Sequence, residues 1–218
     1  MSLRDELVRG LKALNARPEL EAMDVLQFKE QFLLYLDLLK RWNKTFNLTA
    51  IRDDRSHVTR HILDSLVIAP FVKPYPFSDV GSGAGLPGIP LAICQPSRKG
   101  VLIDANGKKT RFLTQVKIEL GLHEIEIVQG RIEDLVDRKF KQIVCRAFKP
   151  LDALVPALRH ALSADGVILA MIGKEPESNV LRAMEAEAKI ALRPLSVPGL
   201  EAERYLAEIR LRSEITKK

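Results

Sequence analysis

Apolar residues in the first seventy positions of the chain recur at helical spacing. They fall three or four residues apart between positions 21 and 41, and a second amphipathic run spans 58–69. The segment 41–54 between them, RWNKTFNLTAIRDD, is polar and basic with interleaved aromatic residues, and it predicts a structured connection rather than a regular helix. Residues 1–70 are therefore expected to form a helical N-terminal extension.

From residue 77 onward, short runs rich in β-forming residues alternate with helical runs. The expected strands are 77–80, 101–104, 124–128, 142–147, 166–172, 192–197 and 205–211. The expected helices are 89–93, 108–120, 151–162 and 175–190. This alternation predicts parallel βαβ units, with the last two strands paired as an antiparallel hairpin at one edge of the sheet. Residues 71–218 are thus expected to form one α/β, Rossmann-like domain.

Composition narrows the class of protein. A chain of 218 residues with 46% hydrophobic and 28% charged residues can form one α/β core with a few additional helices. No uncharged apolar stretch is long enough to span a bilayer, and the first ten residues lack the pattern of a secretory signal, so a cytoplasmic protein is expected. The net charge of +6 favours a polyanionic partner.

Cysteine and histidine spacing gives no indication of a metal site. Cys94 falls in an expected buried helix and Cys145 in an expected buried strand, so both are interpreted as core residues without a disulfide. His57 and His61 are four residues apart, but the glutamate of a zinc-protease motif and a third ligand are missing. His61 and Asp64 are instead expected to help dock the N-terminal helices onto the α/β domain.

The strongest motif is the glycine-rich segment DVGSGAGLPG at 79–88, which follows a strand and precedes a helix. Glycines in such a loop allow the backbone to approach a bound cofactor closely. Read from Gly83, GAGLPG also matches the dinucleotide fingerprint, so an oxidoreductase remains an alternative. Asp79 places a carboxylate beside the loop and Pro87 removes a backbone donor, and both features disfavour a pyrophosphate. They suit the cationic, phosphate-free S-adenosylmethionine better.

Two further segments are expected at the same edge of the sheet. Asp104 ends a strand, where its carboxylate could accept both ribose hydroxyls of an adenosine; alternatively, it could cap the helix that opens at Asn106. Gly130 to Glu133 follow the next strand and could hold an adenine amino group, whereas Glu133 and Asp134 could simply favour a helix N-terminus.

Several motifs together resemble one family. DVGSGAGLPGIPLAI, LIDANGKKTRFL, GRIEDL and CRAF, with the upstream RWNKTFNLTAIRD and RHILDS, are similar to ribosomal RNA small subunit methyltransferase G, also called glucose-inhibited division protein B. The resemblance runs from about Leu36 to the last strand. It implies a class I methyltransferase fold, with a mostly parallel seven-stranded sheet and helices on both faces. It also implies methyl transfer from S-adenosylmethionine to N7 of a single guanine in 16S rRNA.

The resemblance also implies positions for the donor site. They are Gly81 and Leu86 in the glycine loop, Ile132 and Glu133 after the third strand, and Arg146 after the fourth, and the residue-level reasoning adds Gly83 and Asp104. Two positions depart from the common pattern of the family, since Cys145 and Ala105 stand where serines are frequent. Neither change removes a charge.

The implied reaction requires no general base, because guanine N7 carries a free lone pair. Alignment of the reactants would be the main contribution of the enzyme. Arg146 is expected to lie between the donor and the guanine, and the alternative is an ion pair with Glu133 or Asp79. Lys174, after the fifth strand, is expected to face the same crevice, where it would contact RNA or remain solvated.

Basic residues are concentrated in two segments. They are Arg98, Lys99, Lys108, Lys109, Arg111 and Lys117 in the first, and Arg41, Lys44, Arg52, Arg55 and Arg60 in the second. They are candidate phosphate contacts, and the alternative is a set of solvated helix faces. A non-catalytic, adenosylmethionine-binding module that associates with ribosomes is a second functional class. No long apolar edge or heptad pattern indicates an oligomer, so a monomer is favoured.

Overall fold

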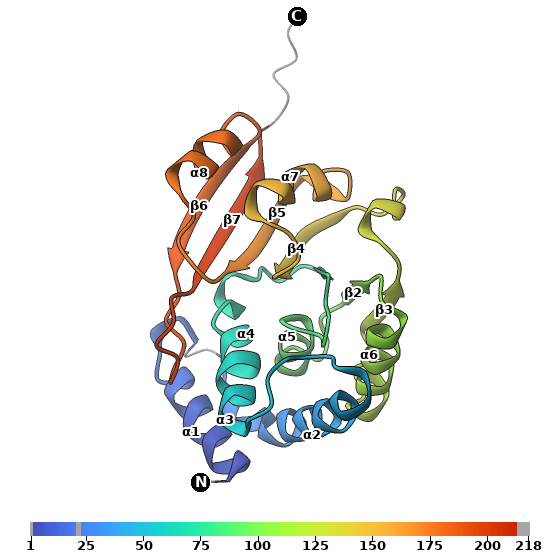
Figure 1. Cartoon of the computed structure of the whole chain (residues 1–218), viewed down its shortest axis with the longest axis vertical. Helices are drawn as coiled ribbons and strands as arrows, with labels where there is room; N and C mark the ends of the chain where they lie inside the picture. The colour runs from blue at the N-terminus through green and yellow to red at the C-terminus, as the bar shows by residue number, and fades with distance from the viewer. Residues whose placement is uncertain (1, 21–22, 213–218) are drawn as a thin grey trace, which may run out of the picture.

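The computed structural model of the chain describes residues 2–20 and 23–212, with only the backbone at residues 19 and 54. Seven strands form one sheet (Figure 1). They are β1 (Phe77–Val80), β2 (Gly100–Asp104), β3 (Ile125–Gln129), β4 (Phe140–Arg146), β5 (Leu162–Ile172), β6 (Ala188–Pro194) and β7 (Tyr205–Leu211). Their order is β3-β2-β1-β4-β5-β7-β6, and only the pairings of β7 with β5 and β6 are antiparallel.

Helices cover this sheet and extend the chain at its N-terminus, and three of them, α3, η3 and α4, follow one another without a gap. They are α1 (Leu3–Asn15), α2 (Lys29–Phe46), α3 (Asp54–His57), η3 (Val58–Leu63), α4 (Asp64–Leu66), α5 (Gly88–Cys94), α6 (Gly107–Glu119), α7 (Leu151–Leu158) and α8 (Ser178–Met184). Short helical turns are η1 (Pro18–Leu20), η2 (Val25–Phe28), η4 (Ala69–Phe71) and η5 (Ile132–Asp134). No helix in the described part of the chain is long and apolar enough to cross a membrane.

The sheet is buried on both faces, as its alternating side chains show. Val144 of β4 belongs to the core that α5, α6 and the N-terminal helices cover, whereas its neighbours Ile143 and Cys145 belong to the core beneath α7 and α8. Strands that are covered on both faces are typical of doubly wound α/β proteins. The expected mostly parallel seven-stranded sheet with helices on both faces is confirmed.

Strand order determines where a ligand can bind. The chain moves outward from β1 through β2 to β3, and then returns to β4 on the other side of β1. Ligands of open α/β sheets bind outside the carboxyl ends of the strands, at such a point of reversal. The glycine-rich loop leaves β1 at this point.

The N-terminal helices share a core with the sheet. Leu7, Leu11 and Leu14 on one side of α1 are fully buried in the same cluster as α2 and α5. On α2, the buried hydroxyl of Tyr35 donates to the carbonyl of Ala84 in the glycine loop at 2.7 Å. The extension therefore contacts the loop that the sequence indicates for the cofactor.

Several expected boundaries were wrong, and two of them have a clear physical reason. Helix α2 continues to Phe46, into the expected connection, because Trp42 packs against both Phe46 and Phe112 of α6, with ring centroids 5.4 and 5.7 Å apart. It ends where Asn47 adopts a left-handed conformation. The helix expected at 175–190 is limited to α8, because Ala188 already pairs with Leu211 in the β6–β7 ladder. Pairing with a neighbouring strand overrides the helical pattern there.

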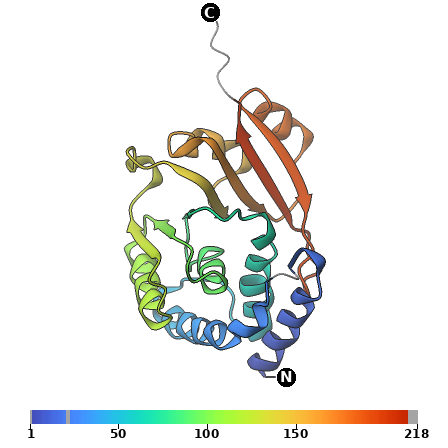
Figure 2. The ribbon, with the colours of Figure 1, turned by 180° about the vertical axis from the view of Figure 1, so that it is seen from behind.

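The connection between β6 and β7 reaches the N-terminal helices, as Figure 2 shows from behind. Val197 of this connection is buried in the core of the extension. A Cβ atom on Gly199 would lie 3.3 Å from the Thr59 side chain of η3. The β6–β7 connection and the N-terminal helices thus lie side by side.

Candidate active site

The glycine loop turns sharply directly after β1. Gly81 has a φ of +72°, and a Cβ atom there would lie 2.5 Å from the Phe148 ring, so a side chain at this position would be strained and would clash. At the other end of the loop, a Cβ on Gly88 would lie 2.6 Å from Asp79 Oδ2. Only glycine permits this close packing of loop and strand.

Asp79 lies beneath the loop, not beside it as the sequence suggested. Its side chain is fully buried, and Oδ2 accepts a hydrogen bond of 2.8 Å from the Gly88 N–H. Oδ1 has no hydrogen-bond partner among the described residues. Burial raises the pKa of Asp79 to about 7, although the Gly88 hydrogen bond and the charge of Arg146 act in the opposite direction. Asp79 can therefore influence a cation in the site through its charge without touching it.

Asp104 connects the glycine loop with the next strand. Its Oδ2 accepts from the Gly83 N–H and its Oδ1 from the Asn106 N–H, both at 2.8 Å. Lys109 Nζ lies 3.7 Å from Oδ2. Capping of α6 falls to Asn106, whose side chain accepts from the Lys108 N–H, so the capping alternative for Asp104 was wrong. The Asp104 carboxylate lies at the carboxyl end of β2, at the edge of a cavity.

This cavity, of about 310 Å³, is the candidate donor site. It is lined by Val80, Gly81, Ile103, Asp104, Ala105, Lys109, Gly130, Arg131, Ile132, Glu133, Ala147, Phe148 and Lys149. Four of the seven predicted cofactor residues therefore line it, namely Gly81, Asp104, Ile132 and Glu133, while Gly83 adjoins it through its bond to Asp104. Leu86 lies in the hydrophobic core and does not line the cavity. Glu133 pairs with Lys149 at 3.3 Å at the rim.

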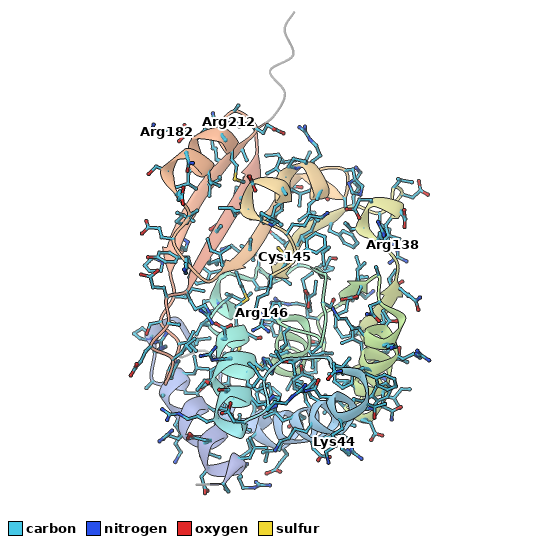
Figure 3. All side chains as sticks on the ribbon, in the orientation of Figure 1. Lys44, Arg138, Cys145, Arg146, Arg182 and Arg212 are labelled. Atoms are coloured by element: carbon cyan, nitrogen blue, oxygen red, sulfur yellow. The ribbon has the colours of Figure 1, made fainter. Side chains whose placement is uncertain are left out.

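Arg146 lies in a second cavity next to the first. This cavity has a volume of about 480 Å³ and is lined by Ile51, Arg60, His61, Asp64, Arg146, Ala147, Lys149, Pro150, Leu151, Met171, Ile172, Gly173 and Arg204. The two cavities share Ala147 and Lys149. Figure 3 shows Arg146 in the centre of the molecule, between the strand ends and α4.

The ion-pair partners named in the alternative interpretation of Arg146 were wrong. Its Nη1 donates to Asp64 Oδ2 at 3.0 Å and to the Arg60 carbonyl at 2.7 Å, not to Glu133 or Asp79. Asp64 is only 2% exposed, and its Oδ1 accepts from Arg204 Nε at 2.9 Å. The expected docking role of Asp64 is confirmed, since its bonds join the extension to β4 and to the start of β7.

The histidines belong to the extension. Nε2 of His61 lies 3.1 Å from Thr49 Oγ1, and its ring packs against His57 with centroids 5.2 Å apart. Burial and the nearby positive charge of Arg146 lower the pKa of His61 to about 3, so this side chain is neutral at physiological pH. Among the described residues, no three His, Cys, Asp or Glu side chains are grouped so as to hold a metal.

Both cysteines are core residues, as the sequence predicted. Cys94 and Cys145 are buried thiols, and burial raises the pKa of Cys145 to about 12. A protonated, buried thiol is a poor nucleophile. The Cys145 side chain points into the core beneath α7, away from the cavities.

Parts of the two basic segments come together in the fold, whereas Lys99 and Lys117 line a separate cavity at the amino ends of β1 to β3. Trp42 of α2 packs against Phe112 of α6, which places the C-terminal part of α2 beside the helix that carries Lys108 and Arg111. Exposed Lys44 and Arg52 line a third cavity, which shares Ile51 with the Arg146 cavity. Lys174 is exposed and follows Gly173 at the rim of the Arg146 cavity. The location favours a shared polyanion-binding surface.

Comparison with known proteins identifies relatives over most of the chain. The model of the family described as rRNA small subunit methyltransferase G matches residues 28–207. The protein of that name from Marinobacter nauticus is 46% identical over 92% of each chain, and that from Neisseria meningitidis is 40% identical over 97% of this chain and all of its own length. A methyltransferase from Geobacter sulfurreducens has the same fold, with a TM-score of 0.57, 14% identity and coverage of 82% of this chain and 89% of its own.

Proposed function

Because this chain belongs to the rRNA small subunit methyltransferase G family, we propose that it methylates N7 of a single guanine in 16S rRNA, with S-adenosylmethionine as the methyl donor. One observation carries the proposal: the donor cavity and the Arg146 cavity adjoin at Ala147 and Lys149, along the carboxyl ends of the parallel strands. A donor and an acceptor base in these two cavities would meet at that junction.

The donor cavity suits an adenosine that carries a positive charge but no phosphate. Asp104 offers a carboxylate for the ribose hydroxyls, and Ile132 offers an apolar surface for the adenine. Gly81 lets the Phe148 ring of the cavity wall pack directly against the loop backbone. The unpaired oxygen of buried Asp79 supplies negative charge beneath the loop, which suits a sulfonium and an ammonium group. When bound, S-adenosylmethionine supplies an electrophilic methyl group.

Orientation, not proton transfer, is the task of the protein in this reaction. The N7 lone pair forms the new carbon–nitrogen bond, the carbon–sulfur bond breaks with its electrons passing to sulfur, and the positive charge passes to the purine. No proton is removed, so no general base is needed. Arg146 holds the guanine at the junction of the cavities, and residues 1–70 act as an extension that completes the acceptor side of domain 71–218.

The basic surface around Lys44 and Arg52 would hold RNA phosphates next to the acceptor cavity. We place this activity in the cytoplasm and assign it to a monomer. The substrate is the small ribosomal subunit or its 16S rRNA.

The test is transfer of labelled methyl from S-adenosylmethionine to small subunits from cells that lack this gene, with the product mapped by cleavage at N7-methylguanine. Label at one guanine is the expected result. Donor binding without label would overturn methylation and favour the non-catalytic ribosome-associated module. Failure to bind the donor would favour the dinucleotide-binding alternative.

A further inference from the structure

The cavity that contains Arg146 holds an unusual charge arrangement. One buried carboxylate, Asp64, accepts hydrogen bonds from two arginines that come from distant parts of the sequence. The side chains of Arg146 and Arg204 are 21% and 18% exposed, against 3% for that of Asp64. The carboxylate is therefore behind the guanidinium groups. The two arginines contribute to the polar surface of the cavity, together with Arg60, His61 and Lys149.

The hydrogen bonds leave specific donors for a ligand. Arg146 uses Nη1 for Asp64 and for the Arg60 carbonyl. Arg204 uses Nε for Asp64 and Nη1 for the Glu203 carbonyl. A guanidinium has five N–H donors and no acceptor. Neither Nη2 group has a hydrogen-bond partner among the described residues, so both remain for a ligand. Both oxygens of Asp64 are engaged, and the two arginines present hydrogen-bond donors to the cavity.

The rest of the cavity wall suits a flat apolar surface. Ile51, Pro150, Leu151, Met171 and Ile172 line it. A volume of about 480 Å³ is large enough for a purine base. Enzymes that modify a base take it out of the stack and hold it in such a pocket, between apolar side chains and groups that read its edge.

Among purines, this arrangement selects for guanine. The edge that carries N7 has a second acceptor, O6, in guanine, whereas adenine has the N6 amino donor at that place. N7 must stay free for methylation, so the arginine donors are available for O6. An amino group facing two guanidinium groups would leave all of these donors unpaired, which is costly in a buried site.

We propose that the cavity between α4, β4 and β5 is the pocket for the target base, in which Arg146 and Arg204 donate to O6 of guanine. Asp64 is the positioning residue that orients both guanidinium groups. This inference rests on the function proposed above. Asp64 also reduces the net charge of the cluster to +1, which lessens the repulsion of a purine that becomes positive on methylation.

The decisive experiment changes the base. Small subunits are reconstituted with 16S rRNA that carries guanine, inosine or 2-aminopurine at the modified position, and single-turnover methylation is measured with the wild-type protein. Inosine keeps O6 and loses the 2-amino group, whereas 2-aminopurine loses O6 and keeps N7. We expect inosine to react within about tenfold of guanine and 2-aminopurine to react at least about a hundredfold more slowly.

Variants then test whether the cluster of Asp64, Arg146 and Arg204 causes the discrimination between guanine and 2-aminopurine. Arg204→Met is expected to reduce the guanine to 2-aminopurine rate ratio by about tenfold, because one of the two arginines that donate to O6 is gone. Asp64→Asn is expected to reduce the same ratio, and Arg204→Lys, which retains a positive donor, to reduce it less than Arg204→Met. Arg138→Gln is the matched control: it lies at the opposite end of β4, pairs with Glu126 on the surface and should leave the ratio unchanged.

Binding measurements accompany the rates. Calorimetric affinity for S-adenosylmethionine should be unchanged in Arg204→Met and Asp64→Asn, while affinity for guanine-containing subunits falls. If wild-type protein does not label guanine subunits, the proposed function itself is wrong. If it labels guanine and 2-aminopurine subunits at rates within tenfold, methylation stands and the reading of O6 is overturned. A purely structural role of Arg204 and Asp64 would lower both rates equally and leave their ratio unchanged, which also overturns the inference.

Discussion

Replacing Asp79 with asparagine tests whether a buried acid lies beneath the donor site. Burial raises the pKa of Asp79 from 3.8 to about 7 in the folded protein. The folded state therefore binds this proton more tightly than the unfolded state, and the resulting stabilisation is complete below pH 4 and is lost as the pH rises through 7. Each pH unit corresponds to about 1.4 kcal/mol, so the change from pH 4 to pH 7 corresponds to about 4 kcal/mol.

Asp79→Asn removes this pH dependence and can retain the acceptor for the Gly88 N–H. A buried amide nitrogen at the position of Oδ1 adds a penalty of roughly 1–3 kcal/mol that does not depend on pH. Other titrating groups, among them His61, contribute equally to both proteins and cancel in the difference. We expect the free energy of unfolding of the variant to rise by about 4 kcal/mol relative to wild type between pH 4 and pH 8.

Urea unfolding of both proteins at half-unit steps from pH 4 to pH 8.5 measures this difference. Two curves that run parallel across the range would refute the assignment of a raised pKa to Asp79. The same proton should be coupled to the donor, because a bound cation favours the ionised carboxylate. Affinity for S-adenosylmethionine should thus increase with pH between 6 and 8 in the wild-type protein but not in Asp79→Asn, as measured by calorimetry.

Three further predictions concern separate parts of the site. Gly81→Ala should weaken S-adenosylmethionine binding by about tenfold in calorimetry. A left-handed φ costs an alanine about 1–2 kcal/mol and its Cβ meets Phe148, so the loop backbone moves out of the conformation that lines the donor cavity; unchanged affinity would contradict this. Lys44→Glu with Arg52→Glu should weaken binding to small subunits. It should also reduce the slope of log affinity against log salt by about one for each phosphate group that the variant no longer neutralises. An unchanged slope would exclude the basic surface. Cys145→Ala should keep full methylation, because the thiol is buried and protonated, and loss of activity in a folded variant would contradict its core role.

Features that depend on neighbouring residues were predictable from the sequence. The glycine loop and Asp104 follow strands within one βαβ unit, so the carboxyl ends of parallel strands bring them to one edge. Short runs rich in β-forming residues predicted all seven strands. They misplaced the start of β6, because local pattern does not show which strand Ala188 will pair with.

Features that depend on the tertiary fold were not predictable in the same way. Asp64 and Arg146 are 82 residues apart, and Asp64 and Arg204 are 140 apart. Local spacing therefore left Glu133 and Asp79 as the alternative partners of Arg146. Arg204 was missed entirely, because a single arginine ahead of the last strand has no distinguishing local pattern. Its one available signal was chemical: a buried acid such as Asp64 requires cationic partners.

The cluster of Asp64, Arg146 and Arg204 makes the N-terminal extension a structural part of the site and not an independent addition to the sheet. Its carboxylate comes from α4, and its arginines come from the end of β4 and from the residue before β7. Removing either arginine leaves Asp64 as a buried, poorly compensated charge, which typically destabilises a protein by about 3–5 kcal/mol. Folding of the extension, docking of the C-terminal hairpin and formation of the acceptor cavity therefore depend on the same ion pairs. A base can be positioned beside the donor only after all three segments have come together.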